Sequence, residues 1–299
     1  MPEAYKGVLQ MKNKPCAIAL GFFDGVHIAH QKIIKSVVDY AKKNKLRPIV
    51  LSFDLSPLEI LSPEKVSYIT TKREKERLIN ALGAEAEFIP VSKEFLDMSA
   101  EDFITEILVK KYNVKYAVCG YNYRFGKGGK GNTDMLRDYG NKLGFCTNVL
   151  ECEFYNGESV SSSRIRELIT NGNISLANKL LGRSFFVEGT IREGKHLGRT
   201  IGFPTANMFF EDAVVIPKKG VYKTLITVNN QAYKAITNTG INPTVGGEKL
   251  RTETYIPDFE GNIYNQKMKI EFVDFIREER KFESIEKLQK QISEDIKRL

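Results

Sequence analysis

The 299 residues are enough for two domains that each bury a core of their own. A hydrophobic content of 42% and an aromatic content of 10% are ordinary for a globular protein. No run approaches the ~18 apolar residues that a membrane-spanning helix needs, and residues 1–14 lack the apolar segment of a signal peptide. We therefore expect a soluble cytoplasmic protein with no membrane partner.

The net charge of +8 comes from 45 basic and 37 acidic residues, which are spread along the chain. Such a balance suits small anionic ligands and does not indicate a nucleic-acid partner. The 4 cysteines show neither a Cys-x-x-Cys pair nor a framework spacing, and three of them lie in apolar, strand-like surroundings, so buried reduced thiols are expected. A homo-oligomer stays open at this stage.

The first half of the chain alternates between apolar runs and segments with helical periodicity. Strands are predicted at 16–20, 47–53, 87–91, 116–119 and 145–150, and helices at 31–38, 71–82 and 99–112. Repeated strand-helix units predict an α/β domain with a Rossmann-like parallel sheet covered by helices on both faces. Ligands then gather at the carboxyl ends of its strands.

The pattern changes after Gly182 to strands separated by tight turns. Strands are predicted at 185–192, 221–228, 232–238, 252–256 and 267–275. A helix is predicted at 284–299, with one apolar stripe formed by Ile285, Leu288, Ile292, Ile296 and Leu299. This order predicts a small antiparallel β-barrel with a C-terminal helix. We place the two unlike domains at residues 1–183 and 184–299.

The stretch 21–30 lies between the first strand and the first helix. Gly21 and Gly25 allow a sharp turn, and the N–H groups at a helix N-terminus attract anions. His27 and His30 are three residues apart and share one helix face. This arrangement favours a triphosphate ligand; a surface pair or core packing is the alternative. No third His or Cys follows nearby, so a zinc site is not expected.

A glycine-rich loop at 120–131 follows the fourth strand and carries Asn122 and Arg124. Its backbone suits an anion-binding nest, and a guanidinium is a forked phosphate ligand. A flexible basic loop is the alternative reading.

The segment 160–169 follows the fifth strand and opens a helix with serines. Ser161 and Ser162 are ordinary helix caps, or they hold a phosphate together with Arg166.

The barrel half carries two chemically distinctive stretches. In 194–207, glycines and basic residues precede Thr205 and Asn207, whose hydroxyl and amide oxygens suit a Mg²⁺ shell completed by water and ATP phosphates. Glu253 lies in the middle of a strand, where Glu is disfavoured unless it faces water or has a task. Near Mg-ATP it is a candidate general base for a substrate hydroxyl.

Taken together, these stretches resemble the bacterial bifunctional riboflavin kinase/FAD synthetase family over nearly the whole chain. Stretches similar to motifs of its adenylyltransferase domain are 21–30, 54–59, 120–126 and 161–166. Those similar to its riboflavin kinase module are 198–207, 217–222, 238–245 and 253–261.

The resemblance implies two reactions in sequence. In the barrel, riboflavin and Mg-ATP give FMN, with Glu253 as general base and Thr205 and Asn207 as Mg²⁺ ligands. In the N-terminal nucleotidyltransferase domain, FMN and ATP give FAD and pyrophosphate, and His27 and His30 stabilise charge on the phosphates. The implied nucleotide- and flavin-binding residues are Gly21, Phe22, Asp24, Gly25, Asn122, Arg124, Ser161, Ser162, Arg166, Lys195, Gly198 and Arg199.

Three positions depart from the family pattern: Ala29 replaces Gly in His-x-Gly-His, Asn122 replaces Asp, and Tyr255 replaces His. Ala29 leaves open a protein that keeps only the kinase reaction. A flavin-responsive RNA-binding regulator and a nucleotidyltransferase with a pantetheine or nicotinate substrate are further alternatives. The dispersed charge argues against the regulator, and the barrel half argues against the other nucleotidyltransferase.

Overall fold

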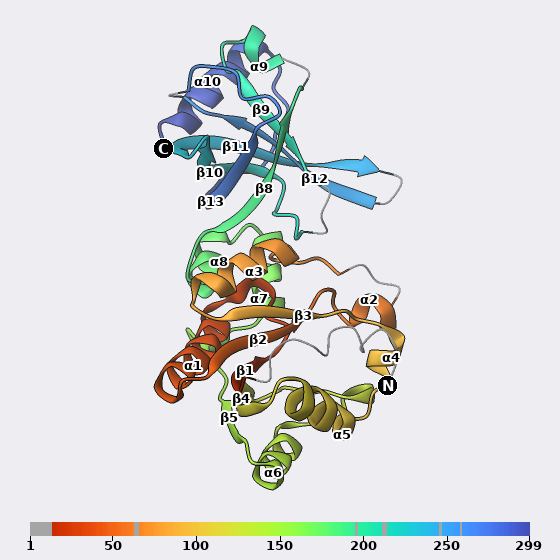
Figure 1. The fold of residues 1–299 in the computed structure, drawn as a ribbon. Coiled ribbons are helices and arrows are strands. Elements are labelled where there is room, and N and C mark those ends of the chain that lie inside the picture. Colours follow the sequence, from red (N-terminus) through yellow and green to blue (C-terminus); the bar gives the residue numbers. More distant parts are fainter. Residues whose placement is uncertain (1–13, 63–65, 195–196, 211–213, 245–246, 258) are drawn as a thin grey trace. The chain divides into compact units, whose positions relative to one another are not determined.

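The computed structural model describes residues 14–62, 66–194, 197–210, 214–244, 247–257 and 259–299. By their contacts the residues form two compact units (Figure 1). The first contains the chain through Val66 and Thr70–Ser161, and the second contains Ser67–Ile69 and Ser162–Leu299.

The first unit is built on a five-stranded parallel sheet of order β3-β2-β1-β4-β5. Its strands are β1 (Cys16–Leu20), β2 (Arg47–Phe53), β3 (Glu85–Ile89), β4 (Val114–Gly120) and β5 (Cys146–Leu150). This confirms the predicted Rossmann-like sheet. The third strand ends two residues before its predicted end, because Pro90 has no N–H to continue the ladder.

Helices cover both faces of this sheet, as predicted. Along β1, Ala17 and Ala19 face a core cluster shared with α1 (Ile28–Asn44) and α3 (Lys72–Ala81). The alternate β1 residues face a second cluster shared with η3 (Phe103–Lys111) and α6 (Thr133–Leu143). The shorter elements are η2 (Asp24–Val26), α2 (Leu58–Leu61), α4 (Lys93–Leu96), α5 (Ala100–Asp102), η4 (Lys127–Gly129), β6 (Phe154–Tyr155) and β7 (Glu158–Ser159).

The predicted helix 99–112 is present, but most of it is a π-helix and not an α-helix. Ser99 caps it by accepting a hydrogen bond from the N–H of Asp102 at 3.0 Å. From Phe103 onward the helix is π-helical, so that the N–H of Tyr112 donates to the carbonyl of Ile107 at 3.1 Å. Four apolar residues of this helix, Phe103, Ile104, Ile107 and Leu108, are all buried.

The second unit contains the predicted antiparallel barrel, closed in the order β10-β11-β12-β9-β8-β13. Its strands are β8 (Phe185–Arg192), β9 (Thr205–Phe209), β10 (Gly220–Val228), β11 (Gln231–Thr244), β12 (Gly247–Tyr255) and β13 (Lys267–Arg277). The strand β9 was not predicted. It pairs with β12 and β8 and so closes the barrel.

The helices of the second unit are α7 (Ser162–Thr170), α8 (Ile174–Leu181), α9 (Leu197–Thr200) and α10 (Ile285–Ile296). The Asn178 amide of α8 donates to the carbonyl of Phe272 at 2.8 Å and accepts from the N–H of Phe185 at 2.7 Å. Contacts therefore group α7 and α8 with the barrel. The domain boundary at 183/184 stays a prediction.

The C-terminal helix α10 is amphipathic as predicted, with one change on its inner face. Ile285 was expected on the apolar stripe but is 55% exposed, whereas Asp295 is 2% exposed. Among the described residues, no helix is long and apolar enough to span a membrane. All four cysteines are free, with Cys16 and Cys119 buried and Cys146 exposed.

Two glycines of the 126–131 loop give a paired test of close packing. Gly126 and Gly128 both have positive φ, 71° and 62°. A Cβ at Gly126 would lie 2.6 Å from the Ala100 backbone, whereas one at Gly128 meets nothing within 4 Å. Gly128→Ala should lower the free energy of unfolding by about 1 kcal/mol, and Gly126→Ala by about 1–3 kcal/mol more. Urea unfolding followed by circular dichroism measures both; equal losses would contradict the packing argument.

Candidate functional site

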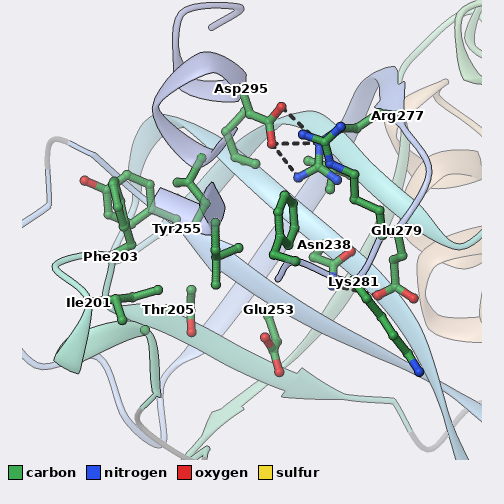
Figure 2. Close-up of a pocket in the computed structure, with 17 residues that line it drawn as sticks. Ile201, Phe203, Thr205, Asn238, Glu253, Tyr255, Arg277, Glu279, Lys281 and Asp295 are labelled. Atoms are coloured by element: carbon green, nitrogen blue, oxygen red, sulfur yellow. Dashed lines mark hydrogen bonds and ion pairs between the residues drawn. The ribbon is translucent and has the colours of Figure 1, made fainter. Parts of the chain in front are cut away.

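The second unit holds a cavity of about 640 Å³ between barrel strands and the C-terminal helix (Figure 2). Apolar side chains, among them Ile201, Ile236 and Ile292, form much of its wall. Phe203 and Tyr255 meet edge to face in this wall, with ring centroids 5.3 Å apart. A mostly apolar cavity with aromatic walls and a few polar groups suits a flat aromatic ligand.

Glu253 comes from β12 and lines this cavity. In the barrel ladder it stands between Asn207 of β9 and Asn238 of β11, so three polar side chains meet at one level of the barrel. Its side chain is 35% exposed and forms an ion pair with Arg251. A second cavity of about 170 Å³ also contains Glu253, together with Arg251 and Lys219. The carboxylate thus has access to an apolar cavity and a charged one.

Thr205 and Asn207 lie two apart on β9 and therefore on one face of that strand. Thr205 lines the larger cavity, and Asn207 is 8% exposed. The backbone of Gly194 packs against Asn207: a Cβ there would lie 2.4 Å from its Nδ2. These two neutral oxygen ligands, one of them facing Glu253 across the ladder, fit a Mg²⁺ ion that keeps several waters and phosphate oxygens.

Asn238 and Glu279 form a second polar pair between the cavities. The Asn238 amide donates to Oε1 of Glu279 at 2.8 Å, and both residues line both cavities. The Oδ1 of Asn238 is buried and has no hydrogen-bond partner among the described residues. A buried amide oxygen of this kind is costly to leave unbonded and is suited to accept a bond from a ligand.

A buried ion pair fixes α10 over the cavity. The guanidinium of Arg277 donates bidentate hydrogen bonds to the Asp295 carboxylate (Figure 2). Its Nε lies 3.1 Å from Oδ1 and 3.0 Å from Oδ2, and its Nη2 lies 2.7 Å from Oδ2. Gln291 adds a bond to Asp295 at 2.8 Å, and Gln289 bonds the carbonyl of Ile201 at 3.1 Å. The helix is therefore tied to β13 and to the segment before β9.

Of the three predicted residues before β9, one is placed at the cavity. Gly198 lines it, and a Cβ there would lie 2.3 Å from the carbonyl oxygen of Phe203. Lys195 lies outside the described residues, and the side chain of Arg199 does too. Their predicted binding roles stay predictions.

In the first unit the predicted turn follows the carboxyl end of β1. Phe23, Gly25 and Val26 have φ of 56°, 79° and 43°, all in the left-handed region. The turn ends at His27, which caps α1 by accepting a hydrogen bond on Nδ1 from the N–H of His30 at 3.4 Å. The two imidazole rings stack with centroids 3.5 Å apart. The structure thus brings the two predicted histidines together at a helix N-terminus.

Burial sets the charge of His30. Desolvation lowers its pKa well below the ordinary value, and His27 and Lys75 lower it further. The ring is therefore neutral at neutral pH. Its Nδ1 is buried without a hydrogen-bond partner among the described residues. A neutral ring of this kind is ready to exchange hydrogen bonds with a ligand.

The other predicted residues of the turn make contacts that stabilise its backbone. Asp24 is 2% exposed and accepts a hydrogen bond from the N–H of Thr70 at 3.2 Å. Phe22 is half-buried. Gly21 packs closely against the next aromatic residue, since a Cβ on Gly21 would lie 3.1 Å from the Phe23 ring. Gly25 donates its N–H to the Thr70 hydroxyl at 3.1 Å. These contacts fix the turn, while ligand binding by its residues stays a prediction.

Asn122 and Arg124 are exposed in the loop after β4. Because β4 pairs in parallel with β1, this loop and the histidine turn leave the sheet at the same edge. Ser161 belongs to the first unit, whereas Ser162 and Arg166 belong to α7 of the second. Their predicted role beside the histidines stays a prediction.

Lys75 and Asp295 are among the buried charges that sequence reasoning missed, although a signal for each of these two is present. Lys75 lies at i−3 and i−4 from Leu78 and Ile79, which are the inward residues of its helix. Asp295 lies at i+3 from the inward Ile292. Both positions point inward, and a charged side chain on an inward stripe needs a partner.

Three comparisons bear on the family. Residues 9–164 match the family described as FAD synthetase, and residues 181–299 match riboflavin kinase. The chain is similar to the bifunctional riboflavin kinase/FMN adenylyltransferase of Bacillus subtilis (strain 168), at 36% identity over 93% of this chain and 89% of that one. It is similar to the protein of the same description from Escherichia coli (strain K12), at 31% identity over 97% and 94%.

The chain is also similar to a solved structure described as a macrolide-efflux protein from Streptococcus pneumoniae. The TM-score is 0.89 at 31% sequence identity, over 96% of this chain and 94% of that one.

Loss of the buried ion pair should release α10. Asp295→Asn leaves the Arg277 guanidinium without its countercharge, which costs about 3–5 kcal/mol for a buried pair. Hydrogen–deuterium exchange should therefore quicken across α10. The matched control, Glu283→Gln, breaks the exposed pair with Lys287, worth about 0–1 kcal/mol. If both variants exchange alike, Asp295 does not fasten the helix.

Proposed function

Because the chain belongs to the family of bifunctional riboflavin kinase/FMN adenylyltransferases, we propose that its second unit converts riboflavin and ATP to FMN and ADP, and that its first unit converts FMN and ATP to FAD and pyrophosphate. The observation that carries the proposal is the position of Glu253, which lies between two asparagines at the wall of an aromatic-lined cavity. Both reactions are expected in the cytoplasm, where the four free cysteines stay reduced.

In the kinase reaction the flavin ring binds against the apolar wall that contains Phe203 and Tyr255. Glu253 accepts the proton of the terminal ribityl hydroxyl, whose oxygen then attacks the γ-phosphorus of ATP, and ADP departs. The ion pair with Arg251 uses only Oε1 of Glu253, so Oε2 remains to accept the proton. Asn238 helps to orient the ribityl chain through its buried amide oxygen.

Mg²⁺ would be held by the Thr205 hydroxyl and the Asn207 amide oxygen. When bound, it neutralises negative charge on the ATP phosphates. The chain's own part is to present both oxygens from one face of β9, with Gly194 packed closely behind Asn207. In this proposal, phosphates bound at these oxygens would lie beside the carboxylate that takes the proton, because Asn207 is the ladder partner of Glu253.

The adenylyltransferase reaction needs no general base from the protein. The FMN phosphate is already anionic at neutral pH, so it attacks the α-phosphorus of ATP without a strong base. The N-terminus of α1 and the imidazoles of His27 and His30 stabilise the charge that develops on the phosphates. Asn122, Arg124 and Ser161 complete the binding set proposed for the first unit, and phosphate binding by Ser162 and Arg166 stays a prediction from the resemblance.

Substitution of the proposed base separates the two reactions. Glu253→Gln keeps the shape of the side chain but cannot accept the proton, so FMN formation should fall about 10²–10⁴-fold, while conversion of supplied FMN to FAD is unchanged. Glu271→Gln, on β13 and paired with Lys269 at 3.0 Å, is the matched control and should leave both rates intact. Comparable loss of both activities in Glu253→Gln would sink the two-site assignment.

Substitution of His30 should give the reverse pattern. His30→Ala removes a group aimed at the phosphates and should lower FAD formation at least tenfold with FMN formation unchanged. Chromatography of products from FMN and ATP, beside products from riboflavin and ATP, measures both. A variant that loses FMN formation instead would contradict the assignment of His30 to the adenylyltransferase.

The same chromatography on the wild-type chain tests the whole proposal. One tube starts from riboflavin, ATP and Mg²⁺, and the other starts from FMN. FAD in both tubes supports both sites and makes Ala29 a tolerated change. FMN without FAD would confine activity to the barrel, and no turnover in either tube would overturn the proposal.

A further inference from the structure

Lys75 is a buried lysine that the reaction described above does not use. It lies on α3 and is 3% exposed. Its ammonium donates three hydrogen bonds: to the carbonyl of Phe22 at 3.0 Å, to the Ser52 hydroxyl at 3.2 Å and to the carbonyl of Phe53 at 3.2 Å. An ammonium has three donors, and here all three are used. Lysine is almost never buried without partners of this kind.

These acceptors belong to two neighbouring strand ends. Phe22 follows β1, and Ser52 and Phe53 end β2, which pairs in parallel with β1. The Ser52 hydroxyl itself donates to the carbonyl of Phe22 at 2.8 Å, and the Phe22 ring lies 4.1 Å from the ammonium. Lys75 therefore ties together the carboxyl ends of two strands from which the candidate site starts.

The strained part of the site begins at Phe23, the residue directly after the Phe22 carbonyl that Lys75 bonds. Phe23 and Val26 have positive φ, which is unfavourable for an aromatic and a β-branched residue. Such backbone persists only where its surroundings determine it. One set of contacts comes from Thr70, which bonds Asp24 and Gly25. The other comes from Lys75, five residues later.

We propose that Lys75 is a positioning residue for the adenylyltransferase reaction, which holds the turn after β1, and through it His27 and His30, in the conformation that receives the ATP phosphates. This inference rests on the proposed function of the first unit. Lys75 reaches the histidines through the backbone, since the turn that it bonds at Phe22 ends at the His27 cap of α1. A small displacement of such a turn has a large effect on rate, because reacting groups must meet in a narrow geometry.

The charge of Lys75 is part of this role. Burial lowers its pKa to about 8; Asp24 and Asp54 oppose this, and Lys72 adds to it. Its positive charge also lowers the pKa of His30. At neutral pH the ammonium keeps its three donors, and as pH rises through about 8 it loses one. FAD formation should therefore decline on the alkaline side.

The test uses the full chain, with FMN and ATP as substrates. Lys75→Met should lower kcat for FAD formation at least tenfold, while kinase activity stays at the wild-type rate. Lys72→Met changes an exposed lysine on the same helix and is the matched control, expected to keep kcat within twofold. Lys75→Arg should recover part of the lost rate and move the alkaline decline to higher pH, since a guanidinium stays charged.

Each outcome decides the inference. Folding of the first unit is followed by its urea transition. The inference is overturned if Lys75→Met folds and its kcat for FAD formation stays within twofold of wild type. It is also overturned if FAD formation declines at the same alkaline pH in Lys75→Arg and in wild type. If Lys75→Met does not fold, Ser52→Ala, which removes one acceptor, decides instead: unchanged kcat overturns the inference, and reduced kcat supports it. A wild-type chain that makes no FAD from FMN overturns the proposed function, and the inference with it.

Discussion

The register of β12 between β9 and β11 is the constraint on which the candidate kinase site depends. Side chains alternate between the two faces of a strand, so a shift of one residue would turn Glu253 to the opposite face of the barrel. In the observed register Glu253 meets Asn207 on one side and Asn238 on the other. The closed barrel leaves no free edge along which β12 can slip. The fold itself therefore fixes the position of the proposed base.

In the first unit, a parallel sheet determines where the candidate site lies. All five strands point their carboxyl ends the same way, which places the loops after β1, β2 and β4 at one edge. The turn after β1 has positive φ at Phe23, Gly25 and Val26. It is held by polar side chains of Thr70, just before α3, and of Lys75 on α3. The cost of burying a lysine is offset by its three hydrogen bonds.

Much of the fold was predictable because the spacing of apolar residues along the chain indicates which face of each helix or strand is buried. The alternation of strands and helices predicted the sheet, and the run of strands after Gly182 predicted the barrel. The strand β9 was not predicted because it is only five residues long, and β12, with which it forms its longer pairing, lies far away in the sequence. Glycine and histidine motifs identified the turn before α1 as a candidate site. Conformations such as the left-handed Phe23 depend on tertiary contacts, which no local pattern displays.

Buried charge was the least visible feature. A charged residue in an amphipathic helix is ordinarily read as solvent-facing, and Lys75 and Asp295 are exceptions that need their partners to be recognised. Arg277, the partner of Asp295, lies on a separate element, 18 residues away. Only the folded chain brings the two together.

The pairing of Asn178 with the barrel also bears on how the protein divides into transferable parts. Its side-chain amide fills backbone positions on β8 and β13 in the way that a neighbouring strand would. A fragment that begins at residue 184 would lose these bonds and the apolar cover that α8 supplies through Leu180 and Leu181. A fragment that begins at Ser162 would carry them along. A transferable part that keeps these bonds is therefore the barrel together with its preceding helix pair.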